Sequence, residues 1–128
     1  MPYLELQDLD AYKLSLEYSR IAWELYKEMD WKIKKIIGDQ MITSVDSVGG
    51  NIAEGYGRFH FLDKNKFYYN SRGSLIESDH WIHLLHVRML ISDEEYNEMK
   101  KIYTQLIIKI NSLIKSQYQR KNSLVSNF

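Results

Sequence analysis

The sequence contains no cysteine, and its single proline is Pro2. Without cysteine the chain can form neither disulfides nor thiolate metal sites, an absence that is typical of proteins in a reducing cytoplasm. Without an internal proline, nothing in the sequence forces a long helix to kink or end. We therefore expect a cytoplasmic protein with an all-α fold.

Long hydrophobic runs and a net charge are also missing. The longest purely aliphatic run covers residues 106–108, whereas a membrane-spanning helix needs about 20 apolar residues. The first residues lack the basic and apolar segments of a secretory signal. The 17 Lys and Arg residues balance the 17 Asp and Glu residues, although residues 97–128 hold six bases against one acid. The composition argues against a membrane protein, and nucleic-acid binders are usually more basic overall.

Apolar residues recur at spacings of three and four along most of the chain, which is the pattern of amphipathic helices. We predict four helices, at about residues 8–29, 34–54, 63–90 and 92–119. Asp63 is a plausible N-cap for the third, and the capping box that begins at Ser92 marks the start of the fourth. Gly55 and Gly57 are expected to end the second in a left-handed C-cap.

The predicted loops are short, so sequential helices should lie antiparallel to one another. The expected fold class is all-α, an antiparallel up-and-down four-helix bundle, with residues 1–120 as a single domain and residues 121–128 as a flexible tail. The third helix has a heptad seam at Tyr68, Leu75, Ile82 and Met89. The predicted core is Ile37, Met41, Val45, Val48, Ile52, Leu75, Ile82, Leu85, Leu106 and Ile110.

Polar residues form a second stripe on each of the two central helices. The stripe of the second helix is Gln40, Ser44, Ser47, Asn51 and Glu54, and that of the third is Asn70, Ser74, Glu77 and Trp81. An antiparallel pair would bring Asn51 and Glu54 near Asn70 and Ser74. Three interpretations remain open: a solvated face, a ligand site, or a hydrogen-bonded network buried between helices or at a subunit interface. The adjacent pair Gly49-Gly50 inside the helix indicates a close approach by a neighbour, or a local kink.

Residues 40–55 and 71–77 closely resemble the motifs of the four helix bundle protein family, whose founding members are encoded in intervening sequences of bacterial 23S ribosomal RNA genes. The motif positions are Gln40, Asn51, Glu54, Gly55, Gly73, Ser74 and Glu77. The resemblance implies a bacterial protein with an antiparallel four-helix bundle, a homo-oligomer that is commonly a pentamer, and no established enzymatic activity. A distant branch, the accessory proteins of diversity-generating retroelements, is similar in fold and binds nucleic acid.

Two clusters of reactive or charged side chains are candidate functional sites. Glu77, His80, His83 and His86 follow one another at three-residue steps, but a carboxylate-bridged di-iron site needs a second Glu-x-x-His, which the sequence lacks. We therefore assign no catalytic, cofactor or metal-binding residues. A basic cluster with tyrosines nearby fits either contacts to single-stranded nucleic acid or packing at a loop and subunit interface. It consists of Arg58, Lys64, Lys66 and Arg72.

The sequence thus predicts a non-enzymatic, homo-oligomeric interaction module whose biochemical role the residues do not reveal. Its expected partner is a second copy of the chain, with no membrane and no cofactor. The alternative is an accessory protein that binds RNA or DNA as a ring-shaped oligomer.

Overall fold

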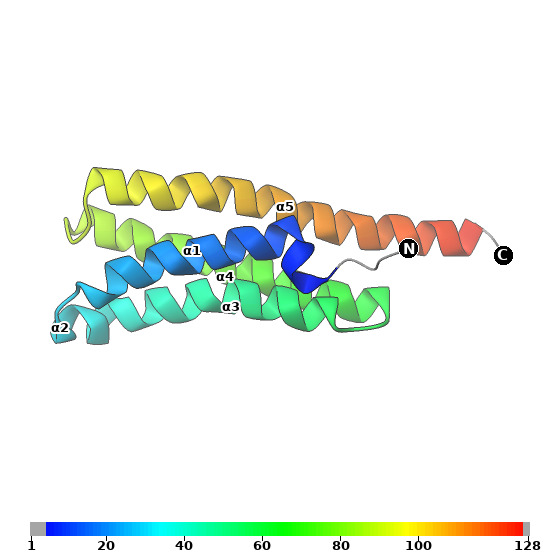
Figure 1. Ribbon diagram of the computed structural model, residues 1–128, viewed down its shortest axis with the longest axis horizontal. Coiled ribbons are helices and arrows are strands. Elements are labelled where there is room, and N and C mark those ends of the chain that lie inside the picture. The colour runs from blue at the N-terminus through cyan, green and yellow to red at the C-terminus, as the bar shows by residue number, and fades with distance from the viewer. Residues whose placement is uncertain (1–4, 127–128) are drawn as a thin grey trace.

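The computed structural model describes residues 5–126, which form an elongated bundle of helices (Figure 1). Within that range there are no strands. The elements are η1 (Leu6–Asp8), α1 (Asp10–Lys27), α2 (Trp31–Ile33), η2 (Lys34–Gly38), α3 (Asp39–Tyr56), α4 (Phe61–Val87) and α5 (Asp93–Ser126). Because α2, the π-helical turn η2 and α3 follow one another without a break, the chain has the four long helical segments that the sequence predicts.

The helices form a square in which α1 and α4 each pack on both α3 and α5. Cross-helix bonds show that neighbours are antiparallel. The Asn65 side chain near the start of α4 donates to the carbonyl of Ile114, far along α5. Asp79, later in α4, pairs with Lys100, near the start of α5. The predicted up-and-down topology is confirmed.

The bundle interior contains every residue of the predicted core, each with 2% or less of its surface exposed. The heptad seam of α4 is confirmed at Tyr68, Leu75 and Ile82, but Met89 is 88% exposed and lies beyond the helix. The seam fails at Met89 because α4 ends at Val87 and the chain then turns toward α5.

Two buried serines on α4 connect it to other helices. The Ser71 hydroxyl donates to the carbonyl of Val48 on α3, at 2.8 Å. Ser78 Oγ lies 2.8 Å from the hydroxyl of Tyr18 on α1. Ser71 thus bonds to the neighbouring helix α3, whereas Ser78 bonds across the interior to α1, and both satisfy polar groups that would otherwise be buried without a partner.

The start of α5 is the helix end that the sequence identified best. Ser92 Oγ accepts from the Glu95 amide and the Glu95 carboxylate accepts from the Ser92 amide, at 3.0 and 2.8 Å, which confirms the capping box. The helix continues to Ser126, past its predicted end near residue 119 and across the proposed boundary of the tail. Figure 1 shows this last part projecting beyond the other helices. Residues 127 and 128 lie outside the described residues.

Two other helix ends differ from the prediction, one in its capping residue and one in its backbone conformation. The N-cap of α4 is His60 rather than Asp63, because His60 Nδ1 accepts from the Leu62 amide at 3.2 Å. The C-cap of α3 is Gly57, but its φ is −74°, so no left-handed conformation calls for glycine there. Gly55 has a different role: a Cβ at this position would lie 2.7 Å from a ring carbon of Tyr68. Gly55 is therefore required by the close approach of α4.

The C-terminus of α4 adopts a left-handed backbone conformation that glycine usually occupies, but the residue there is not glycine. The Leu90 amide donates to the Leu85 carbonyl and the Met89 amide to the His86 carbonyl, which is the Schellman pattern. Met89 occupies its left-handed position with φ 60°. A residue with a Cβ costs about 1–2 kcal/mol in this conformation.

Candidate interaction surfaces

The predicted polar stripes lie on the solvent side of the α3–α4 pair. Gln40, Glu54 and Glu77 are exposed, and Asn51 and Ser74 are half-buried. Within one chain, then, the stripes do not form a network buried between the helices. The two stripes form an open surface that is available to solvent or to another molecule.

Several stripe side chains bond to their own helix. The Asn51 amide donates to the Ser47 carbonyl at 2.9 Å, and the buried Ser44 hydroxyl donates to the Met41 carbonyl at 2.9 Å. Glu54 forms an ion pair with Arg58, one turn later, at 2.7 Å. These local bonds satisfy polar groups without linking α3 to α4.

A shallow depression over α4 brings Asn51 together with Asn70 and Ser74, as the antiparallel pairing predicts. It is lined by Asn51, Tyr69, Asn70, Gly73, Ser74 and Glu77. A Cβ built at Gly73 would meet no atom within 4 Å, so the fold of a single chain does not require this glycine. The missing side chain leaves the α4 backbone accessible at the floor of the depression.

A groove between α1 and α3 is likewise lined by a glycine that the fold of a single chain does not require. Its lining includes Leu16 and Ser19 from α1, and Asp46, Gly50 and Ala53 from α3. Beneath it, a Cβ at Gly49 would lie 2.7 Å from Ser15 Oγ, so Gly49 allows α1 and α3 to pack closely, as the sequence indicated. Its neighbour Gly50 faces outward, and a Cβ there would meet nothing within 4 Å.

The four cations proposed for nucleic-acid contact fall into two groups. Arg58 and Lys66 both lie over the ring of Phe67, at 4.8 and 5.9 Å from its centre. Phe59, in the loop before α4, is 93% exposed. The cations were expected from the sequence but Phe67 was not, although Phe67 directly follows Lys66.

Lys64 and Arg72 bond to neutral groups of the chain, and Arg58 pairs with Glu54. Lys64 Nζ donates to the Tyr56 carbonyl at 2.8 Å, so it neutralises the C-terminal end of α3. Burial, with a smaller contribution from the charge of Arg120, lowers the pKa of Lys64. Arg72 donates to Asn111 on α5 at 2.8 Å. Within residues 5–122, Lys66 alone of the four cations forms neither a hydrogen bond nor an ion pair.

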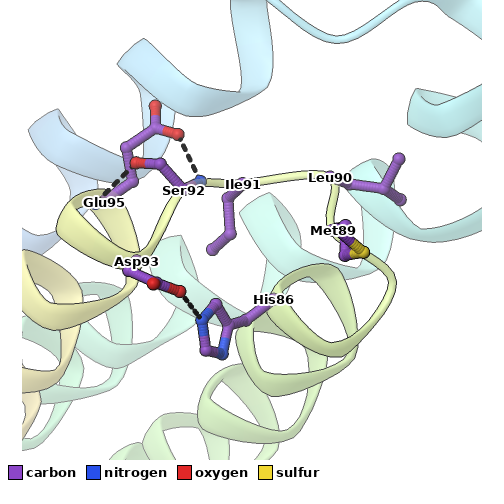
Figure 2. A pocket seen from close by; sticks show the side chains of 7 residues that line it. All are labelled: His86, Met89, Leu90, Ile91, Ser92, Asp93 and Glu95. Atoms are coloured by element: carbon purple, nitrogen blue, oxygen red, sulfur yellow. Dashed lines mark hydrogen bonds and ion pairs between the residues drawn. The ribbon is translucent and has the colours of Figure 1, made fainter.

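The turn between α4 and α5 forms a third depression, with a volume of about 440 Å³ (Figure 2). His86 Nε2 lies 2.7 Å from the Asp93 carboxylate, and the two side chains bridge the turn. The His86 ring also stacks on Tyr96, with 4.1 Å between ring centres. His83 also contacts Tyr96, with 6.3 Å between ring centres, whereas His80 contacts Trp81. Across residues 5–126, no three His, Asp or Glu side chains come together as a metal site would require.

Nor does any described helix combine the length and apolar character needed to cross a membrane.

Comparison with known proteins identifies the relatives of this bundle. A family model described as 23S rRNA-intervening sequence protein matches residues 7–112. A crystal structure of a protein with unknown function, from the S23 ribosomal protein family of Bacteroides thetaiotaomicron, superimposes with a TM-score of 0.74. The two sequences are 23% identical, and the match covers 82% of this chain and 95% of the other, a likeness that shows the fold. None of the curated proteins matches the chain. Because the family model spans most of the sequence, the chain belongs to the 23S rRNA-intervening sequence protein family.

Proposed function

We propose that the protein is a non-enzymatic interaction module that acts as a homo-oligomer. The observation that carries this proposal is the pair of exposed helical glycines, Gly50 and Gly73. Each costs about 1 kcal/mol relative to alanine inside a helix. In the described part of the chain, no atom apart from the adjoining backbone of the same helix lies within 4 Å of the Cβ that either position lacks. Glycine at such a position suits the close approach of a helix from another molecule.

The aromatic content of the surface supports the same function. Trp23 is exposed on α1, and Tyr69 and Tyr118 are exposed on α4 and α5. Aromatic side chains are enriched in protein interfaces relative to the rest of the surface. The chain has ten tyrosines and three tryptophans, more than the interior of four helices uses.

Light scattering coupled to size exclusion at micromolar concentration tests the proposal. We expect a single oligomeric species, and the pentamer implied by the family resemblance is the expected size. A clean monomer would refute oligomeric function.

A second candidate function is the binding of RNA or DNA at the α3–α4 loop. Its support is the exposed ring of Phe59 next to Arg58, with Lys66 one helical turn into α4. Aromatic rings stack on the bases of a single strand, and cations attract its phosphates. An oligomer would repeat this cluster, and the avidity would strengthen a weak contact. Retention of single-stranded RNA on a filter at about 50 mM salt, where such binding is strongest, tests it.

A further inference from the structure

Two opposite faces of the bundle carry exposed hydrophobic side chains along the middle of their helices. In the square of helices, the face spanning α1 and α3 shares no helix with the face spanning α4 and α5. Leu16 and Trp23 on α1, Ile76 on α4 and Ile108 on α5 are each at least half exposed.

The α1–α3 face is a stripe on α1 that borders α3. Its members are Tyr12, Leu16, Ser19, Trp23 and Tyr26, spaced by four and three residues. Ser19 donates to Asp46 of α3 and Tyr26 donates to Asp39 of α3, which fixes the direction in which this stripe points. Trp23 stacks on Tyr26 with 5.4 Å between ring centres. Leu16 flanks the groove over Gly50.

The α4–α5 face is built in the same way from the other two helices. Its members are Tyr69, Arg72 and Ile76 on α4, and Ile108, Asn111, Lys115 and Tyr118 on α5. The hydroxyls of Tyr69 and Tyr118 lie 2.9 Å apart, and Arg72 donates to Asn111. These bonds hold the exposed side chains of α4 and those of α5 next to each other along the contact between the two helices.

The charges on the two faces are complementary. Asp39 and Asp46 each accept a hydrogen bond from a neutral hydroxyl, and neither forms an ion pair with a cation in the described part of the chain. On the opposite face, Arg72 bonds to a neutral amide and Lys115 has no carboxylate partner among residues 5–122. Opposite charges on facing patches fix the register and the choice of partner.

We propose that the α1–α3 face of one copy binds the α4–α5 face of the next copy, head to tail. This inference rests on the proposed oligomeric function and specifies its interface. The groove over Gly50 would take an aliphatic side chain of the partner, such as Ile76 or Ile108, and Asp46 would meet Arg72 or Lys115. Because the two faces differ, every copy offers one of each, and the contact repeats until a ring closes.

Two single variants, one on each face, test the pairing. Leu16→Glu places a charge on the α1–α3 face and Ile76→Glu does so on the α4–α5 face. Each is expected to convert the oligomer to monomer in light scattering. Phe59→Glu, a matched change at an exposed residue outside both faces, should leave the oligomer intact. Far-UV circular dichroism and thermal melts check that all three variants are folded.

Mixing the two variants gives the decisive result. One intact interface remains between an Ile76→Glu chain, through its α1–α3 face, and a Leu16→Glu chain, through its α4–α5 face. An equimolar mixture should therefore form dimers and nothing larger, because the outer faces of each dimer are both blocked. Gly50→Phe and Ile108→Glu provide an independent pair of variants with the same expected outcome.

The possible failures can be told apart. A monomeric wild-type protein would reject the oligomeric function together with its interface. An oligomeric wild type whose two variants also remain oligomeric would reject only these faces. Single variants that each form dimers on their own would mean that like faces pair with like, and a mixture that stays monomeric would show that the two unblocked faces do not bind each other; either result overturns the head-to-tail arrangement.

Discussion

The hydroxyl of Tyr18 donates a hydrogen bond to Ser78 Oγ across the interior of the bundle, over 2.8 Å. The direction follows from the serine, because Ser78 Oγ uses its own proton to donate to the Leu75 carbonyl at 2.6 Å. Both side chains are fully buried. The bond therefore joins α1 to α4, two helices that are not neighbours in the square, and fixes how they lie relative to each other.

This relationship predicts unequal effects for removing the two hydroxyls. Tyr18→Phe leaves Ser78 bonded to Leu75 and should cost about 1 kcal/mol of unfolding free energy. Ser78→Ala leaves the buried Tyr18 hydroxyl without a partner and should cost more, about 1–3 kcal/mol. Urea denaturation of the single and double variants measures both. Equal losses would contradict the assigned direction of the bond.

The interior tyrosines should make stability fall at high pH. Burial raises the pKa of Tyr68 to about 12, whereas an unfolded tyrosine titrates near 10. Burial raises the pKa of Tyr18 as well. Because the unfolded chain loses these protons first, the stabilisation from both is complete below pH about 10, and the part that Tyr68 contributes is lost between about 10 and 12. Urea titrations at several pH values should show a shallower decline for Tyr68→Phe than for the wild type.

A charge in the core should unfold the protein. Val48 is completely buried on α3, so Val48→Asp would bury a carboxylate without a partner, at a cost of several kcal/mol. Thr43→Asp is a control on the exposed side of the same helix and should remain folded. Circular dichroism distinguishes the two outcomes, and a cooperative, near-normal melt for Val48→Asp would argue against the assigned core.

Replacing Met89 by glycine should stabilise the chain. Glycine adopts a φ of 60° without the steric cost that a Cβ brings, which predicts a gain of about 1 kcal/mol in unfolding free energy. Arg88→Gly changes the adjacent residue, whose φ is −81°, and should not stabilise. A thermal melt of each variant compares them, and identical shifts would exclude the backbone explanation.

The nucleic-acid binding proposed as the second function should depend on Arg58 and Lys66. Changing both to glutamate is expected to abolish RNA retention at about 50 mM salt and to leave the helical content unchanged. Lys32 and Lys35 are both exposed at the opposite end of the bundle, and the same change there should have little effect. If both double variants lost retention equally, the binding would reflect overall charge rather than the α3–α4 loop.

Helical periodicity was sufficient to predict the core of the bundle. Val45 and Leu106 are buried because a stripe at spacings of three and four can face only one way once four helices pack together. The same periodicity failed at Met89, since a hydrophobic residue in register does not show where the helix ends. That end depends on the Schellman bonds of Met89 and Leu90, which use backbone groups that carry no sequence signal.

The candidate surfaces were only partly predictable. The spacing placed Asn51 near Ser74, and both line the depression over Gly73. It did not show that Lys64 is held by the end of α3, because its acceptor is a backbone carbonyl. Gly50 and Gly55 look alike in sequence. A tyrosine ring from the next helix fills the space at Gly55, whereas the space at Gly50 is empty, and this difference depends on tertiary packing.

The short antiparallel turns also have a kinetic consequence. Contacts between α3 and α4, and between α4 and α5, join segments that are close in the chain, so little loop entropy is lost when they form. The seam between α1 and α5, where Asp10 pairs with Lys109, joins segments from opposite ends of the sequence. Its closure carries the largest entropic cost, so α1 and α5 should come together last, after the hairpins between them have formed.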